Sequence, residues 1–317
     1  MKVTEYIKNA DKTLVSFEIL PPLKGKSIQS IYDTLDPLME FKPPFINVTY
    51  HRAEFIFKRN AEGSFEKTVI RKRPGTVGIC SSIVNRYHID AVPHIVCGGF
   101  TKEETEDALI DLAFLSINNI LIIRGDPNKS ETTFMQEPGG HAHAIDLMKQ
   151  AVQMNKGIFL QEDLTEVTPT DFCIGVAGYP EKHYEAPNMK SDLKYLKDKV
   201  DAGAQYIITQ MFFDNSKYFE FVKTCREIGI NVPIIPGIKP ITSKNQINTL
   251  PRLFHIEIPE EFSGEVQKSK SDAEAKQIGI DWCVQQCKEL KAANVPLLHF
   301  YTMSNPGPVK EVVSRVF

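Results

Sequence analysis

The 317-residue sequence has no run of about 18 apolar residues, the length that a membrane-spanning helix requires. Its first 13 residues are polar and charged and lack the apolar centre of a signal peptide, so we expect a cytoplasmic protein without a membrane partner. Net charge is also low, formally -3 at pH 7. This balance gives no electrostatic case for binding nucleic acid or an anionic membrane surface.

Two nucleotide-binding motifs are absent. No G-x-G-x-x-G follows the first predicted strand and no Walker A sequence occurs, so neither a Rossmann dinucleotide site nor a P-loop is supported. The sequence also gives little support for a metal site. His141 and His143 follow a Gly-Gly pair with no third ligand in view, which favours a loop role. Cys283 and Cys287 stand four apart on a predicted helix without further ligands nearby, so we expect no metal.

Cysteine is scarce, with six residues in the chain, and several lie inside apolar runs. This context predicts buried, reduced thiols, as in a reducing cytosol. The six are Cys80, Cys97, Cys173, Cys225, Cys283 and Cys287.

What the sequence does contain is a regular alternation of short apolar runs and longer helical stretches. Several runs are apolar almost throughout, as parallel strands buried on both faces are. They predict strands at residues 14–19, 45–49, 91–96, 119–123, 173–177, 206–209, 233–236 and 297–301. The stretches between them predict helices at residues 26–40, 102–116, 143–155, 191–202, 216–228 and 272–292.

Eight strands that alternate with helices favour a closed barrel over an open sheet. Because no internal repeat or Pro/Gly-rich linker divides the chain, we expect residues 1–317 to form one (β/α)8 domain of the TIM type. Residues 128–140, which are polar and contain Gly-Gly, are predicted to be a long loop, and residues 252–270 are predicted to be irregular.

In a barrel of this type the active site lies at the carboxyl ends of the strands. Nearly every predicted strand delivers a polar or ionisable side chain there, which indicates a large polar pocket. Each side chain also has a structural interpretation. Glu18 could pair with a lysine, and His94 could be a satisfied core histidine. Arg124 and Asp126 could pair with each other, and Gln210 could cap a loop.

Taken together, these groups fall in short motifs that resemble methylenetetrahydrofolate reductases in order and spacing. Each motif alone is a weak signal, but the collinear set covers residues 14–305 and is specific. The motifs are Ser16-Phe17-Glu18 with Pro21-Pro22, Val48-Thr49-Tyr50, Pro93-His94, Arg124-Gly125-Asp126, Tyr179-Pro180-Glu181-x-His183 with Glu185-Ala186, Asp192-Leu193 leading to Lys199-Val200-Asp201-Ala202-Gly203-Ala204, Thr209-Gln210-x-Phe212-Phe213-Asp214, Ile235-Pro236-Gly237-Ile238-x-Pro240 and His299-Phe300-Tyr301-Thr302.

The resemblance implies a (β/α)8 barrel that binds FAD non-covalently without a Rossmann domain. In that family a reduced nicotinamide, NADH or NADPH, passes a hydride to the flavin and leaves. Methylenetetrahydrofolate then occupies the same face, takes the hydride and becomes 5-methyltetrahydrofolate, in a ping-pong sequence. The implied partners are therefore small molecules, folate and reduced nicotinamide, and the chain is expected to form a homo-oligomer as family members commonly do.

The same resemblance assigns roles to residues. Glu18 matches the proton donor, and Asp126 matches a carboxylate near the flavin that also holds the pterin. Arg124 and Lys199 can offset the charge of a pyrophosphate. The positions that match FAD contacts are Tyr50, His94, Arg124, Gly125, Asp126, Ala144, Tyr179, His183, Ala186, Asp192 and Lys199. The substrate positions are Thr49, Asp126, Gln210, Gln246 and Tyr301.

Two positions depart from the family pattern. Asn305 stands where an arginine often follows the last strand, so a folate contact must be replaced or lost. Leu250 stands where some members have phenylalanine. The sequence also ends soon after the last strand, so we expect it to lack the S-adenosylmethionine-sensing regulatory domain of longer eukaryotic members.

The most specific expectation concerns the pKa of Glu18. A glutamate that is protonated near neutral pH needs a pKa raised from about 4.3, and desolvation by apolar neighbours raises it. Two other functions stay open, a flavin-free pterin-binding methyltransferase and a non-catalytic folate-binding barrel, although an acid at Glu18 argues against the second. The apolar neighbours of Glu18 are Val15, Phe17, Ile19, Leu20, Pro21 and Pro22.

Overall fold

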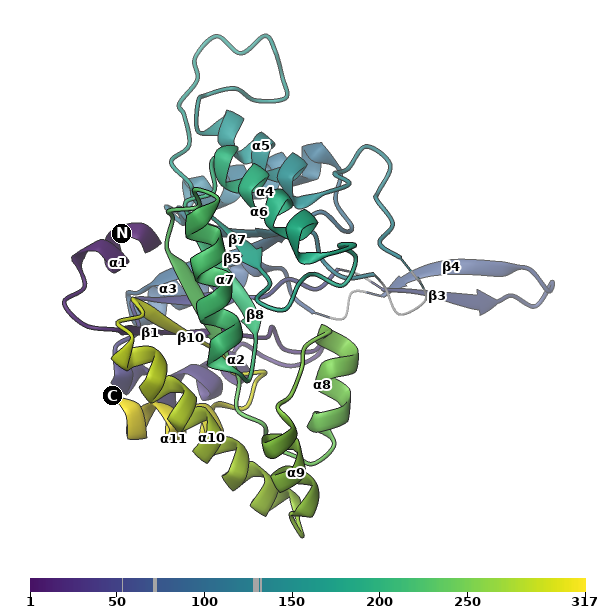
Figure 1. Ribbon diagram of the computed structural model, residues 1–317. Coiled ribbons are helices and arrows are strands. Elements are labelled where there is room, and N and C mark those ends of the chain that lie inside the picture. Colours follow the sequence, from purple (N-terminus) through teal and green to yellow (C-terminus); the bar gives the residue numbers. More distant parts are fainter. Residues whose placement is uncertain (53, 71–72, 128–130, 132) are drawn as a thin grey trace.

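The computed structural model describes residues 1–317 except 53, 71–72, 128–130 and 132. Its centre is a closed barrel of eight parallel strands in the order β1-β10-β9-β8-β7-β6-β5-β2, which confirms the predicted fold class (Figure 1). The strands are β1 (Leu14–Ile19), β2 (Phe45–Val48), β5 (Asp90–Val96), β6 (Asn119–Ile123), β7 (Cys173–Gly178), β8 (Tyr206–Met211), β9 (Ile234–Ile238) and β10 (Leu297–Tyr301).

Helices surround the barrel and follow most of its strands (Figure 1). They are α2 (Gln29–Leu35) with the 3-10 helix η1 (Asp36–Phe41), α3 (Thr76–Tyr87), α4 (Lys102–Phe114), α5 (Ala144–Met154), α6 (Met189–Asp201), α7 (Asn215–Glu227), α8 (Gln246–Phe254), α9 (Glu260–Lys268), α10 (Asp272–Ala292) and α11 (Pro306–Val316). Within the described residues, no helix is both long and apolar enough to cross a membrane.

Two sequence predictions about helices need correction. Residues 252–270 are not irregular, because they contain the end of α8 and all of α9, which buries Phe262 and Val266 four residues apart. The predicted helix at 26–40 splits into α2 and η1, because Pro37 at the start of η1 cannot donate a backbone hydrogen bond.

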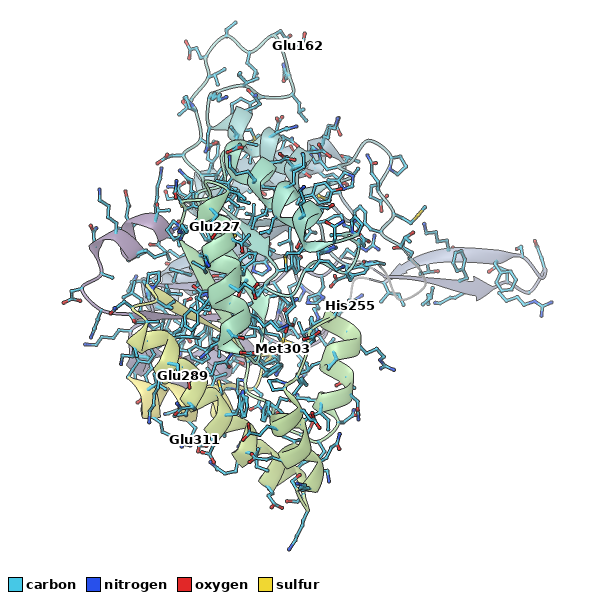
Figure 2. The ribbon with its side chains drawn as sticks, in the orientation of Figure 1. Glu162, Glu227, His255, Glu289, Met303 and Glu311 are labelled. Atoms are coloured by element: carbon cyan, nitrogen blue, oxygen red, sulfur yellow. The ribbon has the colours of Figure 1, made fainter. Side chains whose placement is uncertain are left out.

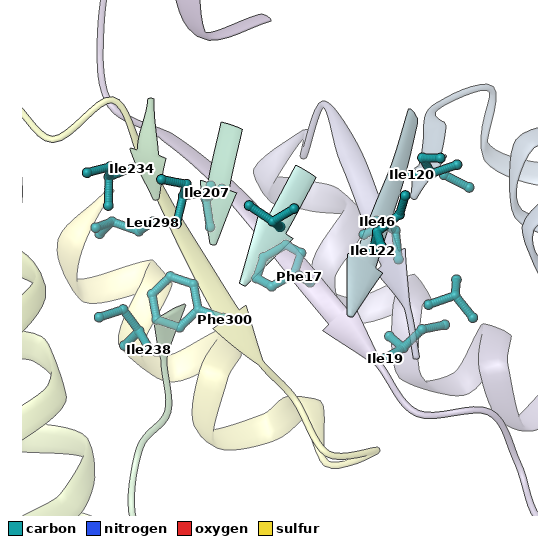
Figure 3. Close-up of a cluster of buried hydrophobic side chains, with 14 of the residues drawn as sticks. Phe17, Ile19, Ile46, Ile120, Ile122, Ile207, Ile234, Ile238, Leu298 and Phe300 are labelled. Atoms are coloured by element: carbon teal, nitrogen blue, oxygen red, sulfur yellow. The ribbon is translucent and has the colours of Figure 1, made fainter. Parts of the chain in front are cut away.

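Two separate apolar layers hold the barrel together. The outward faces of the strands pack against the helices. In this outer layer, the rings of Phe17 and Phe300 lie against each other with their centroids 6.2 Å apart (Figure 3). A second cluster fills the interior around Tyr206. Helix α1 (Val3–Asn9) packs on this cluster, and the backbone N–H of Val3 donates to Asn119 Oδ1 at the amino end of β6. The interior is therefore closed at the amino ends of the strands, which leaves the carboxyl ends for a site.

The predicted cysteine environment is confirmed, since all six cysteines are buried and free. Burial raises the pKa of Cys80 and Cys97, so these thiols are protonated at neutral pH.

The chain also forms an unpredicted antiparallel hairpin of β3 (Glu54–Arg59) and β4 (Phe65–Ile70), which projects from the barrel on the side opposite α1 (Figure 1).

Gly279→Ala should destabilise the protein, because α10 approaches the chain after β9 closely. An added Cβ would lie 2.0 Å from the carbonyl oxygen of Ile241, and this atom belongs to the backbone, so it cannot rotate away as a side chain could. Overpacking of this kind costs about 1–3 kcal/mol, so the thermal midpoint should fall by several degrees. Gly264→Ala in α9 is the control, because its Cβ meets nothing within 4 Å and alanine favours a helix. Equal midpoints for both variants would contradict the prediction.

Candidate active site

Glu18 lies near the carboxyl end of β1 and faces the barrel interior. Successive side chains of a strand alternate between faces, so Ser16 shares this face while Phe17 packs outward (Figure 3). The Glu18 carboxylate lies 3.3 Å from His94 Nε2 on β5 and 3.6 Å from His299 Nε2 on β10. Ser16 Oγ in turn lies 2.8 Å from His299 Nδ1. Three strands thus build one buried polar cluster, which we call the Glu18 cluster (Ser16, Glu18, His94 and His299).

The histidines of this cluster control the pKa of Glu18. Burial alone would raise that pKa, but the charge and polar contacts of His94 and His299 lower it to about 2. The expectation of a raised pKa is therefore wrong. Two of the apolar neighbours in sequence, Phe17 and Ile19, lie in the outer layer, and the histidines come from strands far along the chain. Glu18 is thus a carboxylate at neutral pH, beside two groups that can carry a proton.

A second polar cluster begins at Arg124, directly after β6. Its Nη1 lies 2.6 Å from Glu185 Oε2, and its guanidinium lies 4.9 Å from the ring centroid of Phe134. Burial opposes the charge of Arg124, but Glu185 outweighs burial and raises its pKa. Arg124 therefore pairs with Glu185 rather than with Asp126. The Asp126 residue is exposed and follows Gly125, whose φ of +87° is a conformation that favours glycine.

The loop after β7 and helix α6 complete this second cluster. The rings of Tyr179 and His183 meet edge to face at a centroid distance of 4.7 Å. The backbone N–H of His183 donates to Asp192 Oδ2 at 2.9 Å. Lys199 Nζ donates to the carbonyl oxygen of Ala177 at 3.0 Å, and burial lowers the pKa of this lysine to about 8 although Asp192 opposes the shift. A desolvated ammonium of this kind would be stabilised by an anion.

The remaining predicted flavin positions are less closely connected. Tyr50 and His94 line a cavity of about 210 Å³ with Phe100, whose ring centroid lies 5.0 Å from that of Tyr50. Ala186 is buried beside the second cluster, and its backbone N–H donates a hydrogen bond to the carbonyl oxygen of His183. Ala144 begins α5 and packs against the outer core.

The predicted substrate positions lie at the ends of β2, β8, β9 and β10. Thr49 is half-buried directly after β2. The side-chain oxygen of Gln210 accepts the backbone N–H of the next residue at 2.9 Å. The hydroxyl of Tyr301 donates to the carbonyl oxygen of Thr209 at 2.6 Å, so the ring is fixed against β8. Gln246 and Tyr301 line a common cavity of about 220 Å³.

Three side chains of the site were not predicted as site residues. Glu185 comes from a loop, and no sequence rule pairs it with Arg124. Ser16 and His299 carry a signal that was available, because each lies two residues before a predicted site residue on its strand and therefore shares that residue's face. The register confirms this arrangement, since Ser16 is opposite His299 and Glu18 is opposite Tyr301.

Comparison with known proteins gives one consistent family. The family model "Methylenetetrahydrofolate reductase" matches residues 2–316. The chain is 32% identical over 317 residues to "Methylenetetrahydrofolate reductase (NADH) 1" of Arabidopsis thaliana, covering 96% of this chain and 49% of that protein. It is 32% identical over 292 residues to "5,10-methylenetetrahydrofolate reductase" of Salmonella typhimurium, covering 92% of this chain and 86% of that protein. The chain spans about half the length of the plant relative.

Among solved structures, a protein of Clostridium thermocellum has a similar fold. It is described as an uncharacterized protein that binds two copies of 5-methyl-5,6,7,8-tetrahydrofolic acid. The TM-score is 0.56 at 12% sequence identity, covering 98% of this chain and 96% of that one. At this identity the likeness supports the barrel fold alone.

Proposed function

Because the chain belongs to the methylenetetrahydrofolate reductase family, we propose that it reduces 5,10-methylenetetrahydrofolate to 5-methyltetrahydrofolate, with FAD as a non-covalent cofactor and NADH or NADPH as the reductant. The observation that carries the proposal is that the Glu18 cluster and the second polar cluster, around Arg124, lie at the same end of the barrel. The first can supply a proton and the second can hold a phosphate-bearing cofactor.

The residues of the second cluster fit the proposed FAD. Arg124 and Lys199 are cations on neighbouring elements, and the partly buried Lys199 ammonium donates to a carbonyl oxygen of β7. Tyr179 and His183 add aromatic surface beside them. When bound, the flavin would supply hydride transfer, while the protein supplies position and electrostatics.

The chain's own chemical contribution is a proton. Opening the five-membered ring of methylenetetrahydrofolate requires a proton on the departing nitrogen before the carbon can accept a hydride. We assign this proton to the Glu18 cluster, with Glu18 as the residue that contacts the substrate and His94 and His299 as the groups that share its proton.

A spectrum of the purified protein tests the proposal. We expect a yellow protein whose flavin, identified as FAD after denaturation, bleaches with NADH or NADPH and recovers its colour on addition of methylenetetrahydrofolate, with 5-methyltetrahydrofolate as product. FMN in place of FAD would contradict the cofactor assignment. A protein that stays colourless after incubation with FAD would favour a flavin-free methyltransferase. A flavin that no nicotinamide bleaches would favour a binding protein without this activity.

Asp126→Asn should raise the midpoint potential of the flavin and weaken folate binding. A carboxylate near the flavin disfavours the anionic reduced form, and the same carboxylate can accept hydrogen bonds from the pterin. Loss of such a bond costs about 1–1.5 kcal/mol, so folate affinity should fall by roughly tenfold. Redox titration and folate titration of the same preparation measure both effects. Asp33→Asn is the control, because Asp33 is exposed on α2 and accepts a hydrogen bond from Gln29. An unchanged potential together with unchanged folate affinity would refute this role.

A further inference from the structure

Lys239 is a buried cation beside the proposed substrate site. It follows β9 directly and its residue is 5% exposed. It lines the cavity of about 220 Å³ that also contains Gln246 and Tyr301. Thr242 and Asn305 add further polar groups to the cavity wall, and Met303 marks its position in Figure 2. Of the described residues that line this cavity, none is acidic.

The environment of Lys239 leaves its charge uncompensated. Burial lowers the pKa of the ammonium, and the thiol of Cys283 opposes this shift only in part. Lys244, five residues along the same loop, contrasts with it, since its ammonium donates to the carbonyl oxygen of Ser269 at 2.6 Å. In the described part of the chain, Lys239 lies within ion-pair distance of no carboxylate. Burying an unpaired charge is costly, so the site favours an anion that enters the cavity.

The cavity lies on the side of the barrel that the proposed flavin positions do not occupy. Those positions lie largely on or after β2, β5, β6 and β7 and on α6, whereas Lys239 follows β9, between β8 with Gln210 and β10 with Tyr301 in the strand order. Beyond β10 comes β1, which carries Glu18. Pro308 and Val309, in the first turn of α11, also line the cavity, so the positive end of that helix dipole points the same way.

We propose that this cavity binds a carboxylate of the substrate's glutamate tail, and that Lys239 is the residue that selects for it. The inference rests on the proposed function, because it names the part of the folate that this side of the site recognises. An ammonium is a compact charge that suits a carboxylate without fixed geometry. Thr242 donates to Gln246 Oε1 and so positions this side chain, and the amide NH2 groups of Gln246 and Asn305 can complete the hydrogen bonds of the carboxylate oxygens.

The test compares two substrates in two proteins. The first is methylenetetrahydrofolate and the second is the amide of methylenetetrahydropteroate, which lacks the glutamate and carries no carboxylate. In the wild type we expect removal of the tail to raise KM by about tenfold, as expected for a lost charge-assisted hydrogen bond. Lys239→Met, which keeps the length of the side chain, should raise KM for the full substrate by a similar factor and leave KM for the tail-less substrate nearly unchanged. Lys310→Met is the control, because Lys310 pairs with Glu40 on the surface.

Two results would overturn the proposal. One is a wild type that does not distinguish the two substrates, and this arm needs no variant to fold. The other is a Lys239→Met protein that weakens both substrates equally, which would make Lys239 structural. Equilibrium titration with 5-methyltetrahydrofolate and its tail-less analogue repeats the comparison without turnover. It separates the two proposals, because a protein that binds the tail through Lys239 but reduces no folate would contradict the proposed function alone.

Discussion

Glu18→Gln should slow the folate half-reaction by about 10²–10⁴-fold, the usual contribution of a positioned acid, while the nicotinamide half-reaction stays within a few-fold of wild type. The substitution keeps the size of the side chain and removes the carboxylate that can take up a proton from the histidines and pass it to the substrate. Ring opening of methylenetetrahydrofolate needs a proton, whereas hydride transfer from a nicotinamide does not. The effect should therefore appear in one half-reaction and not in the other.

Rapid mixing of each half-reaction separately measures the effect. NADH or NADPH is mixed with the oxidised protein in one experiment, and methylenetetrahydrofolate is mixed with the reduced protein in the other. Glu257→Gln is the matched control, because its carboxylate is 76% exposed and pairs with Lys217 outside the Glu18 cluster. Equal slowing of both half-reactions would make Glu18 a structural or flavin-positioning residue. If neither slows, the acid lies elsewhere.

The pH dependence of the folate half-reaction tests how the cluster holds its proton. With its pKa lowered to about 2, Glu18 carries no proton at neutral pH, so the proton that it passes to the substrate has to come from a protonated neighbour such as His299. Burial lowers the pKa of His299, which moves the loss of that proton to lower pH. The rate should therefore fall as pH rises through the acidic range below about 6.5, the ordinary pKa of a histidine, and the fall should be absent in the nicotinamide half-reaction.

The barrel strands were predictable because strands buried on both faces are apolar almost throughout. The predicted bounds of β1, β6 and β10 agree with Leu14–Ile19, Asn119–Ile123 and Leu297–Tyr301. The hairpin of β3 and β4 was missed because its residues pair with each other outside the barrel, where no alternation with helices marks them. Helix α9 was missed because Pro259 and several charged residues resemble a loop. The buried pair Phe262 and Val266, four residues apart, was the available signal.

The candidate site was predictable in position but not in its electrostatics. Strand ends locate Glu18, Arg124 and Tyr301 at one end of the barrel, because parallel strands share a direction. The pKa of Glu18 depends instead on distances across the barrel to histidines of other strands, which sequence neighbours do not report. Lys239 was overlooked for the same reason, since only the fold shows that a lysine in Ile-Lys-Pro is buried with no acid beside it among the residues that the structure describes.

Arg124→Ala should weaken FAD retention by roughly 10- to 150-fold, which corresponds to the loss of about 1.5–3 kcal/mol from a charged hydrogen bond. The guanidinium is 19% exposed and lies over the ring of Phe134, so its position is fixed before a cofactor arrives. Its partner Glu185 is 33% exposed and sits on a loop, so solvent can take over that carboxylate when a phosphate binds Arg124. The fold should survive, because Arg124 follows β6 and does not belong to the barrel core.

Dialysis of the purified proteins against flavin-free buffer, followed by titration with FAD, measures this change. Arg315→Ala is the matched control, because the guanidinium of Arg315 pairs with Asp281 on the surface, between α11 and α10. Its loss should leave the FAD affinity unchanged. Thermal melting of the apoproteins separates retention from folding, and we expect the Arg124→Ala midpoint to stay close to that of the wild type. With FAD added, the wild type should gain more stability than the variant, because the stabilisation that a ligand gives the folded state grows with the logarithm of its affinity. Equal FAD affinity in the two proteins would remove Arg124 from the cofactor site and leave its contact with Glu185 as a structural ion pair.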